Sequence, residues 1–417
     1  MPIAPFHLMA KPVGPHCNLA CRYCFYTEKA ALFPEAPARM SDAVLEAYVR
    51  KVAEESHGPE LHYAWQGGEP TLAGLDFFRK AIRLQKEIAQ GRSVSNSLQT
   101  NGLLIDGDWC QFLAQEGFLV GLSLDGPAHC HDAYRVDRLG RGCHDQVMRA
   151  LACFQKHGVA FNTLTSVHDR NSVCPLEVYR FLRDAGVEHM QFIPLVERKK
   201  TAESEELGLK LGTPPKPGEA PGRQAVEPWC VQPEAFGDFL IAIFDEWIRN
   251  DVGRIFVQTF EVAVGHWMGG SGGLCHFAEV CGRALIVEVN GDLYACDHFV
   301  YPEYKRGNLL TGSLPEMIEH PLQIAFGNAK RDSWAAACRK CPYLFACHGG
   351  CLKHRFVRGS VETEPDNYLC AGYRRFFAHV DPWFQILSDL LRSGRPAAEL
   401  LRIGRVRDQG SRYLSGG

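Results

Sequence analysis

Three cysteines within eight positions, in the segment KPVGPHCNLACRYCFY (residues 11–26), constrain this chain more than any other feature. Cys17, Cys21 and Cys24 have the spacing C-x3-C-x2-C, with no fourth cysteine beside them. A structural zinc ion takes four protein ligands, so these thiolates cannot close a zinc site alone. They can hold three irons of a [4Fe–4S] cluster and leave the fourth iron open for a substrate or cofactor. The alternatives are a zinc site completed by His16 and a redox pair of Cys21 and Cys24.

The composition is that of a globular protein with unusual cysteine usage. The 417 residues are 46% hydrophobic and carry a net charge of −3, so electrostatics does not indicate a nucleic-acid or membrane-surface partner. No apolar run is long enough to span a bilayer, and the first residues lack a secretory signal, so we expect a cytoplasmic protein. Seventeen cysteines in a reducing compartment indicate metal or redox chemistry. Six are scattered, and we interpret them as small buried hydrophobic residues: Cys110, Cys130, Cys143, Cys153, Cys174 and Cys230.

Short β-type runs alternate with amphipathic helical stretches from about residue 6 to 195. Repeated βα units predict a parallel sheet, and six of them predict an α/β fold with a partial (β/α)6 barrel. Polar groups follow the strands, at the edge where parallel α/β folds place their active sites. The expected strands are 6–13, 61–67, 94–102, 118–126, 159–167 and 190–196, and the expected helices lie near 41–56, 75–90, 107–116, 145–157 and 175–185.

We predict three regions along the chain. They are the barrel (1–230), a cysteine-rich domain (231–375) and a C-terminal helix with a basic tail (376–417). Residues 197–229 are rich in proline, glycine and charge, which predicts a long surface loop or lid. Beyond it we expect helices at 233–250 and near 373–391, and a β-hairpin that turns at Asn290 and Gly291.

Eight further cysteines lie in the last third of the chain, and eight is the number that two fully ligated [4Fe–4S] clusters need. Two four-cysteine zinc sites are the alternative, because C-x2-C pairs serve zinc equally well. The three-cysteine motif upstream favours iron and sulfur. The eight are Cys275, Cys281, Cys296, Cys338, Cys341, Cys347, Cys351 and Cys370.

The first motif, with an aromatic residue on each side of Cys24, resembles the signature of the radical S-adenosylmethionine superfamily. The resemblance implies that the open iron binds the amino and carboxylate groups of S-adenosylmethionine. One electron from the cluster then cleaves the sulfonium, and the resulting 5′-deoxyadenosyl radical abstracts a substrate hydrogen. The protein's part is to hold and shield these cofactors.

Other segments match positions that bind S-adenosylmethionine in this superfamily. WQGGEPTL looks like its GGE motif, in which two glycines allow close backbone approach and the glutamate accepts from the methionine ammonium. Taken alone, that segment is equally consistent with a turn that ends a strand. Arg135 is equally consistent with a charged residue on the surface of a helix. The expected contacts are Tyr23 (near the adenine), Gln66, Gly67, Gly68, Glu69, Ser123 and Arg135 (at the methionine carboxylate), and Leu195.

The later cysteines resemble the SPASM domain, an auxiliary-cluster extension of radical enzymes that modify peptides and proteins. The resemblance implies a nearer and an outer auxiliary cluster, so that the protein would hold three [4Fe–4S] clusters and S-adenosylmethionine. Full ligation favours electron transfer, which makes the reaction a net two-electron oxidation in which a base takes a proton. The implied ligands are Cys275, Cys281, Cys296 and Cys351 for the nearer cluster, and Cys338, Cys341, Cys347 and Cys370 for the outer one.

Asp297, in the segment CDHFVYPEYKRGNL, is the candidate base, with a helix-capping or turn aspartate as the general alternative. With NSLQTNG, AWQGGEPTL, LVGLSLDGP and QFIPLVER, this segment resembles the anaerobic sulfatase-maturating enzymes over roughly residues 5–390. The resemblance implies Asp297 as base and Tyr26 and Gln66 at the substrate site. It implies oxidation of a Cys or Ser, in a C/S-x-P-x-R motif of an unfolded sulfatase polypeptide, to Cα-formylglycine. A flavodoxin- or ferredoxin-type electron donor is implied as well, and we expect a monomer.

Two other functions compete with this one. A radical enzyme that matures a ribosomally made peptide, by crosslinking or thioether formation, would share both cysteine regions. A non-catalytic electron carrier would have no need of GGEP, SLDGP or an open three-cysteine site, and this chain has all three. The sequence does not choose between Cys and Ser as the oxidised residue.

Overall fold

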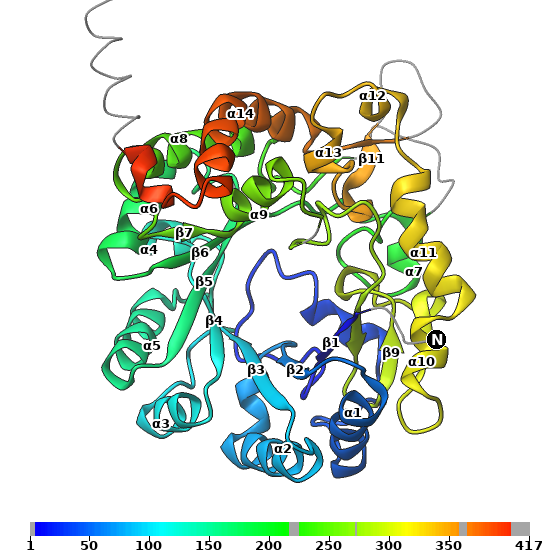
Figure 1. Cartoon of the computed structure of the whole chain (residues 1–417). Coiled ribbons are helices and arrows are strands. Elements are labelled where there is room, and N and C mark those ends of the chain that lie inside the picture. Colours follow the sequence, from blue (N-terminus) through cyan, green and yellow to red (C-terminus); the bar gives the residue numbers. More distant parts are fainter. Residues whose placement is uncertain (1–4, 217–224, 272, 358–364, 402–417) are drawn as a thin grey trace, which may run out of the picture.

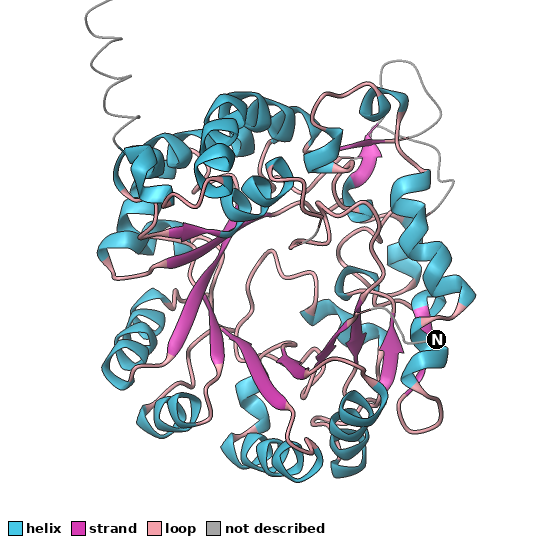
Figure 2. Ribbon diagram, in the orientation of Figure 1, coloured by secondary structure: helices cyan, strands magenta, loops and turns pink. Residues whose placement is uncertain are grey.

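A curved ten-stranded sheet with helices along its outer side is the frame of the molecule (Figures 1 and 2). The computed structural model describes residues 5–216, 225–271, 273–357 and 365–401. The strand order is β10-β9-β8-β1-β2-β3-β4-β5-β6-β7, and all pairs from β8 to β7 are parallel. The strands are β1 (His7–Ala10), β2 (Glu60–Trp65), β3 (Ser93–Thr100), β4 (Leu119–Ser123), β5 (Ala160–Val167), β6 (His189–Pro194), β7 (Phe256–Val257), β8 (Ala284–Val287), β9 (Asp292–Tyr294) and β10 (Lys305–Asn308).

The predicted βα alternation is confirmed. Helices begin at side-chain caps, since Ser41 Oγ accepts from the N–H of Val44 at 3.3 Å and Asp106 accepts from that of Trp109 at 3.0 Å. One helix ends at Gly158, whose φ of +67° suits glycine. The crossover helices are α1 (Asp42–Glu55), α2 (Leu75–Ile88), α3 (Gly107–Gln115), α5 (His144–His157) and α6 (Pro175–Asp184).

Aromatic side chains fill the space between the sheet and its outer helices. Trp65 of β2 is 1% exposed, and its ring centroid lies 5.2 Å from that of Tyr48 and 5.6 Å from that of Phe78. Burial of each such side chain contributes about 1.5–3 kcal/mol. These aromatic contacts therefore hold the outer helices against the sheet.

The cysteine-rich part of the chain extends the same sheet. β8 pairs with β1 in parallel, from His7 opposite Ala284 to Ala10 opposite Val287. β8 and β9 form the predicted hairpin, and its turn residue Gly291 has a φ of +87°. The turn between β8 and β9 therefore lies at the carboxyl end of β1, and β9 runs back along β8.

Two long helices lie side by side near β6 and β7 (Figure 1). They are α8 (Pro233–Asn250) and α14 (Cys370–Arg392), at the predicted places. They touch at two glycines, since a Cβ on Gly237 would lie 2.7 Å from the carbonyl oxygen of Gly372. The other α-helices are α4 (Ala128–His131), α7 (Ala202–Glu206), α9 (Gln258–Trp267), α10 (Leu314–Ile318), α11 (Pro321–Asp332), α12 (Ala336–Arg339) and α13 (Leu344–Cys347).

The remaining short elements complete the connections. The two-stranded sheet pairs β11 (Arg355–Val357) with β12 (Asp366–Asn367). The 3-10 turns are η1 (Thr27–Leu32), η2 (Pro70–Ala73), η3 (Asp297–Phe299), η4 (Pro302–Tyr304), η5 (Leu352–His354) and η6 (Ala397–Glu399). Part of the predicted surface loop (217–224) and most of the predicted basic tail (402–417) lie outside the described residues. A search of the described helices finds none that could cross a membrane.

Candidate active site

The segment after β1, drawn in blue, lies on the inner side of the curved sheet (Figure 1). It carries Cys17, Cys21 and Cys24, all half-buried. Burial raises the pKa of the Cys17 thiol to about 11 and that of Cys21 to about 12, and the charges of neighbouring thiols add to the effect. Thr27 donates its N–H to Cys24 Sγ at 3.4 Å, and Asn101 Nδ2 donates to Cys17 Sγ at 3.7 Å. Donors of this kind stabilise thiolate ligands of an iron–sulfur cluster.

The two glycines of the GGE segment hold it against the cysteine segment. The N–H of Gly68 donates to the carbonyl of Gly14 at 2.8 Å. A Cβ on Gly68 would lie 2.0 Å from the carbonyl oxygen of His16, and Gly67 has a φ of +148°. Only glycine permits this approach, so the geometry agrees with the backbone role that the sequence predicts for both residues.

Glu69 is 1% exposed, and its carboxylate is occupied by groups of the protein. It accepts from Thr71 Oγ1 at 2.6 Å, Thr100 Oγ1 at 2.8 Å and the N–H of Asn101 at 2.7 Å. The N–H of Thr71 donates at 3.0 Å as well. Four donors match the acceptor capacity of a carboxylate, so Glu69 ties the GGE segment to the end of β3. Its contact with a methionine ammonium stays a prediction.

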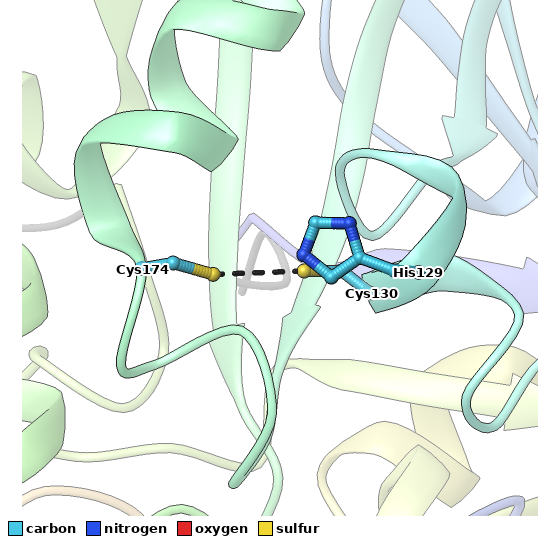
Figure 3. A group of neighbouring side chains, drawn as sticks. All are labelled: His129, Cys130 and Cys174. Atoms are coloured by element: carbon cyan, nitrogen blue, oxygen red, sulfur yellow. Dashed lines mark hydrogen bonds between the residues drawn. The ribbon is translucent and has the colours of Figure 1, made fainter.

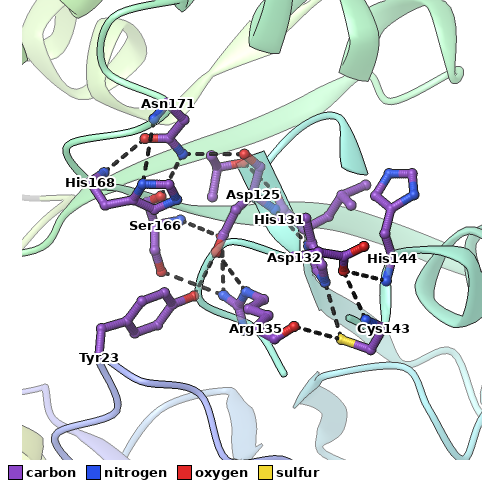
Figure 4. Close-up of polar contacts among 12 residues, drawn as sticks. Tyr23, Asp125, His131, Asp132, Arg135, Cys143, His144, Ser166, His168 and Asn171 are labelled. Carbon is purple, nitrogen blue, oxygen red and sulfur yellow. Dashed lines mark hydrogen bonds and ion pairs between the residues drawn. The ribbon is translucent and has the colours of Figure 1, made fainter. Parts of the chain in front are cut away.

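Arg135 is buried, which rules out the alternative of a surface charge. Its Nε and Nη2 donate to the two carboxylate oxygens of Asp125 at 2.8 and 3.1 Å (Figure 4). Tyr23 donates its hydroxyl to Asp125 at 2.6 Å, and Ser166 donates its N–H at 2.8 Å. Burial opposes ionisation of Asp125, but the charge of Arg135 and the hydrogen bonds from it prevail and lower the pKa of this carboxyl group. Asp125 thus joins Tyr23 to Arg135, two residues predicted to contact S-adenosylmethionine.

A second layer of polar side chains supports this group (Figure 4). His131 Nδ1 accepts from the N–H of Asp125 at 3.2 Å, and its Nε2 lies 3.3 Å from Cys143 Sγ. Asp132 accepts from the N–H groups of Cys143 and His144. The ligand-type atoms of His131, Asp132 and Cys143 lie within 4.8 Å of one another. They are engaged in these local bonds, and their role is to fix the segment that carries Arg135.

Lys11 gathers the three residues that the sequence predicts around the substrate. It is 1% exposed at the end of β1, and its Nζ forms an ion pair with Asp297. The same Nζ lies 3.6 Å from the ring centroid of Tyr26 and donates to Gln66 Oε1 at 3.4 Å. Asp297 belongs to η3, whose capping residue is Cys296, so it is not a helix-capping aspartate. The structure therefore brings Tyr26, Gln66 and Asp297 together around one buried ammonium.

Glu288 closes this cluster from the side of β8. Tyr26 donates its hydroxyl to both oxygens of Glu288, at 2.7 and 2.8 Å. Burial raises the pKa of Glu288 to about 6, although the charge of Lys11 and the Tyr26 hydrogen bond favour its ionised form. Asp297, with 22% of its side chain exposed, is the accessible carboxylate of the pair.

A pocket lies between the cysteine segment and the loop that follows β6. Its walls include Phe25 and His298, the chain neighbours of Tyr26 and Asp297, with ring centroids 5.1 Å apart. Leu211–Pro214 of the loop form another wall, as does the buried ion pair of Lys353 with Glu197. The predicted surface loop thus borders a small cavity of about 10 Å³ beside His298, the chain neighbour of the candidate base.

The eight later cysteines separate into two groups by their electrostatic neighbours. Burial is the largest cause that raises the pKa values of Cys281, Cys296, Cys347 and Cys370, and neighbouring thiol charges add to it. Cys351 and Cys275 act on Cys281 and Cys296, whereas Cys338 acts on Cys347 and Cys370. The grouping equals the two predicted ligand sets, and cluster binding by each set stays a prediction.

The spacing of the thiols tests the zinc alternatives. With Zn–S bonds of about 2.3 Å, the sulfurs of a tetrahedral site lie about 3.8 Å apart. In the described part of the chain, the groups of three ligand atoms within 4.8 Å of one another include none of the eleven cysteines of the two motif regions. In the described residues these thiols are therefore not grouped as tightly as a tetrahedral zinc site requires.

The six scattered cysteines lie apart from these groups, and four of them are buried: Cys110, Cys130, Cys143 and Cys230. Cys153 and Cys174 are half-buried. The Sγ atoms of Cys130 and Cys174 are 3.6 Å apart, with exposed His129 beside them (Figure 3).

Two predicted residues, Ser123 and Leu195, lie at strand ends, and their contacts with S-adenosylmethionine stay predictions. Ser123 is the last residue of β4 and pairs with Leu164 of β5. Leu195 follows β6 directly, and its N–H donates to the carbonyl of Val167 at 2.9 Å. Sequence reasoning missed Lys11, Glu288 and Asp125. Asp125 had a signal, because it is a carboxylate directly after the fourth strand, within SLDGP.

Comparisons with known protein families match two regions of the chain. Residues 12–182 match the Radical SAM superfamily, and residues 275–342 match an iron–sulfur cluster-binding domain, SPASM. The predicted domain boundaries at 230 and 375 fall outside both matches and stay predictions.

Full-length relatives extend the match. A serine-type anaerobic sulfatase-maturating enzyme of Bacteroides thetaiotaomicron is 41% identical over 401 residues, 95% of each chain. A cysteine-type enzyme of Clostridium perfringens is 32% identical over 91% of this chain and 97% of the relative. A solved structure of native anSMEcpe with bound AdoMet and Cp18Cys peptide superposes with a TM-score of 0.80 at 30% identity, covering 93% of this chain and 100% of that one.

Proposed function

The chain belongs to the family of the anaerobic sulfatase-maturating enzymes, and from this premise we propose that it oxidises a sulfatase residue to Cα-formylglycine. The residue would be the Ser or Cys of a C/S-x-P-x-R motif in an unfolded polypeptide. The observation that carries the proposal is the cluster of Tyr26, Gln66 and Asp297 around Lys11. Maturation of a ribosomally made peptide, the alternative, is not better supported by the relatives.

The family's cofactors are S-adenosylmethionine and [4Fe–4S] clusters. When bound, they supply the radical that removes a hydrogen atom and the acceptor for the electron that the substrate loses next. We assign the cluster that cleaves S-adenosylmethionine to the three early cysteines, Cys17, Cys21 and Cys24. The two auxiliary clusters are assigned to the two groups of later cysteines.

The proton balance of the oxidation shows which chemical group the protein must supply. Loss of a hydrogen atom from Cβ of serine, and then of one electron and the hydroxyl proton, leaves an aldehyde. The thioaldehyde formed from cysteine needs water to become that aldehyde and releases sulfide. Either route needs one base for the proton of the OH or SH group.

Asp297 suits this role because its carboxylate is held in place and accessible at the same time. The ion pair with Lys11 holds the carboxylate in position, and an ionised carboxylate is the form that can accept a proton. Cys296, the adjacent residue, is a proposed ligand of the nearer auxiliary cluster. The proton would therefore pass to Asp297, and the electron would pass to the cluster that Cys296, the preceding residue, is proposed to hold.

We assign serine as the preferred substrate residue. The serine-type relative shares 41% identity with this chain, against 32% for the cysteine-type relative. A flavodoxin- or ferredoxin-type protein is the proposed donor, and a monomer in the cytoplasm is the proposed state.

The test uses the anaerobically reconstituted full chain with S-adenosylmethionine, a strong reductant and two peptides that carry Ser-x-Pro-x-Arg or Cys-x-Pro-x-Arg. Mass spectrometry detects a hydrazine-reactive aldehyde together with 5′-deoxyadenosine. Aldehyde on the serine peptide is expected. Aldehyde on the cysteine peptide alone would reverse the residue assignment, and 5′-deoxyadenosine without any aldehyde would refute the proposed substrate.

A further inference from the structure

Two buried cations lie where the two groups of later cysteines meet. Lys330 of α11 is 1% exposed, and Arg355 of β11 is 4% exposed. Lys330 Nζ donates to the carbonyl of Ala278, inside the 275–281 segment of the nearer ligand set. It also donates to the carbonyl of His348 at 3.2 Å. One ammonium therefore bridges segments that carry ligands of both sets.

Arg355 fills the loop between Cys347, of the outer set, and Cys351, of the nearer set. Its Nε donates to the carbonyl of Gly349 and its Nη2 to the carbonyl of His348, both at 3.0 Å. His348 and the two glycines after it have φ values of +47°, +71° and +65°. A Cβ on Gly349 would lie 2.6 Å from Arg355 Nη2, so the loop is shaped around the guanidinium.

Neither cation forms an ion pair with a carboxylate of the described residues. An unpaired buried charge costs several kcal/mol, so an ammonium and a guanidinium here require a countercharge. Thiols of the two ligand sets are the acidic groups that act on both cations. Burial lowers the pKa of Lys330 to about 8 and Arg355 lowers it further, whereas Cys281, Cys347 and Cys351 raise it.

A [4Fe–4S] cluster held by four thiolates is negatively charged, and one more electron increases that charge. A buried cation nearby stabilises the reduced form and raises the reduction potential, since local charge and hydrogen bonding set cluster potentials. The two cations are thus placed to act on both auxiliary clusters together.

We propose that Lys330 and Arg355 are positioning residues that neutralise the auxiliary clusters and keep their reduction potentials high enough to accept an electron from the substrate. The inference deepens the proposed function, because the electron is the one lost in the oxidation to the aldehyde. The potentials are measured without a substrate, so their outcome is independent of the substrate assignment.

The experiment compares neutral and charge-conserving variants in a background that lacks the first cluster, with Cys17, Cys21 and Cys24 all replaced by Ala. The auxiliary clusters are titrated with reductant and followed by electron paramagnetic resonance. Lys330→Met is expected to lower at least one midpoint by a tenfold change in the reduction equilibrium, 59 mV for one electron. The midpoints of Lys330→Arg should stay close to those of the parent. Likewise, Arg355→Gln should lower a midpoint, whereas Arg355→Lys should not.

Lys340→Met is the matched control, because Lys340 is exposed beside Cys341 and its charge is screened by water. It should leave the midpoints unchanged. Unchanged midpoints in fully loaded Lys330→Met and Arg355→Gln would overturn the proposal. If Lys330→Met loads too little iron, Lys330→Gln, which keeps an N–H donor, is titrated instead. Equal iron loss in Lys330→Met, Lys330→Gln and Lys330→Arg would give Lys330 a packing role and refute the proposal.

Discussion

Lys11 and Asp297 stand 286 positions apart in the chain, yet they form an ion pair at the carboxyl end of β1. The ammonium is buried and the carboxylate is partly open, so the pair has a fixed side and an accessible side. Pairing of β8 with β1 places the hairpin that precedes Asp297 beside the strand that precedes Lys11. The contact joins the first cysteine segment to the segment that carries Cys296.

Asp297→Asn should abolish aldehyde formation and leave cleavage of S-adenosylmethionine nearly intact. A general base contributes about 10²–10⁴-fold, so the aldehyde rate should fall at least hundredfold while 5′-deoxyadenosine changes only a few-fold. Both products are measured in one assay by mass spectrometry. Glu303→Gln, an exposed carboxylate in the same segment, is the control. Equal loss of both products in Asp297→Asn would argue against the base role.

Glu288→Gln should remove a pH dependence of stability. Burial raises the pKa of Glu288 from 4.5 to about 6, so the folded state binds the proton more tightly than the unfolded state. The protein therefore loses about 2 kcal/mol from this group as the pH rises from 4.5 to 6. The variant should be more stable than the parent at pH 7.5 and similar at the lowest pH that the fold tolerates. Denaturant unfolding at several pH values measures this, and parallel curves for both proteins would contradict it.

Gly68→Ala should displace the GGE segment from the cysteine segment. The added Cβ would meet the backbone of His16 at 2.0 Å, where no flexible side chain can yield. Overpacking of this kind costs about 1–3 kcal/mol or more. We expect weaker binding of S-adenosylmethionine, measured by equilibrium dialysis, and less iron in the first cluster. Gly107→Ala, whose Cβ meets nothing within 4 Å, is the matched control. Normal binding in Gly68→Ala would show that the segment can shift freely.

The pairing of Asp125 with Arg135 should show strong coupling in a double-mutant cycle. Asp125→Ala leaves a buried guanidinium without its partner, which costs about 3–5 kcal/mol of unfolding free energy. Asp125→Ala with Arg135→Met should cost less than the sum of the two single changes. The exposed pair of Asp76 and Arg79 provides the comparison and should show far weaker coupling. Additive single effects at Asp125 and Arg135 would refute this coupling.

Cys370→Ser should remove the iron of one cluster, about a third of the total in the loaded protein. Cys370 belongs to the proposed outer ligand set, and a cluster that loses one of four ligands is held weakly. Iron and sulfide analysis after reconstitution gives the content. Cys174→Ser, outside the two motif regions, should keep its iron. Full iron in Cys370→Ser would show that the ligand sets are assigned wrongly.

The sheet could be predicted because its signals are local, and the proposed cluster ligands rest on signals of the same kind. Alternation of apolar runs marks β1 to β6, and the spacing of Cys17, Cys21 and Cys24 stands within one short segment. Asp297, Tyr26 and Gln66 were found through the resemblance of whole segments to a family. The described structure adds the contacts that join them.

Lys11, Glu288 and Asp125 could not be assigned by the same reasoning. A lysine that follows a short strand reads as a surface charge, and only the pairing of β1 with β8 makes Lys11 buried. In the sequence, Glu288 is one residue of a predicted hairpin. Its hydroxyl partner, Tyr26, lies 262 residues away, so no local pattern links the two. Contacts between residues so far apart depend on the order of strands in the sheet, which no local sequence pattern reveals.

The position of β1 between β2 and β8 has a consequence for protein engineering. A fragment that ends at residue 230 would lack β8, so one side of β1 would carry free N–H and C=O groups next to the cysteine segment. Unpaired edges of this kind invite association with other chains. An exchange of cysteine-rich halves between relatives should therefore place its junction after the hairpin of β8 and β9, so that β1 keeps both neighbours in the chimaera.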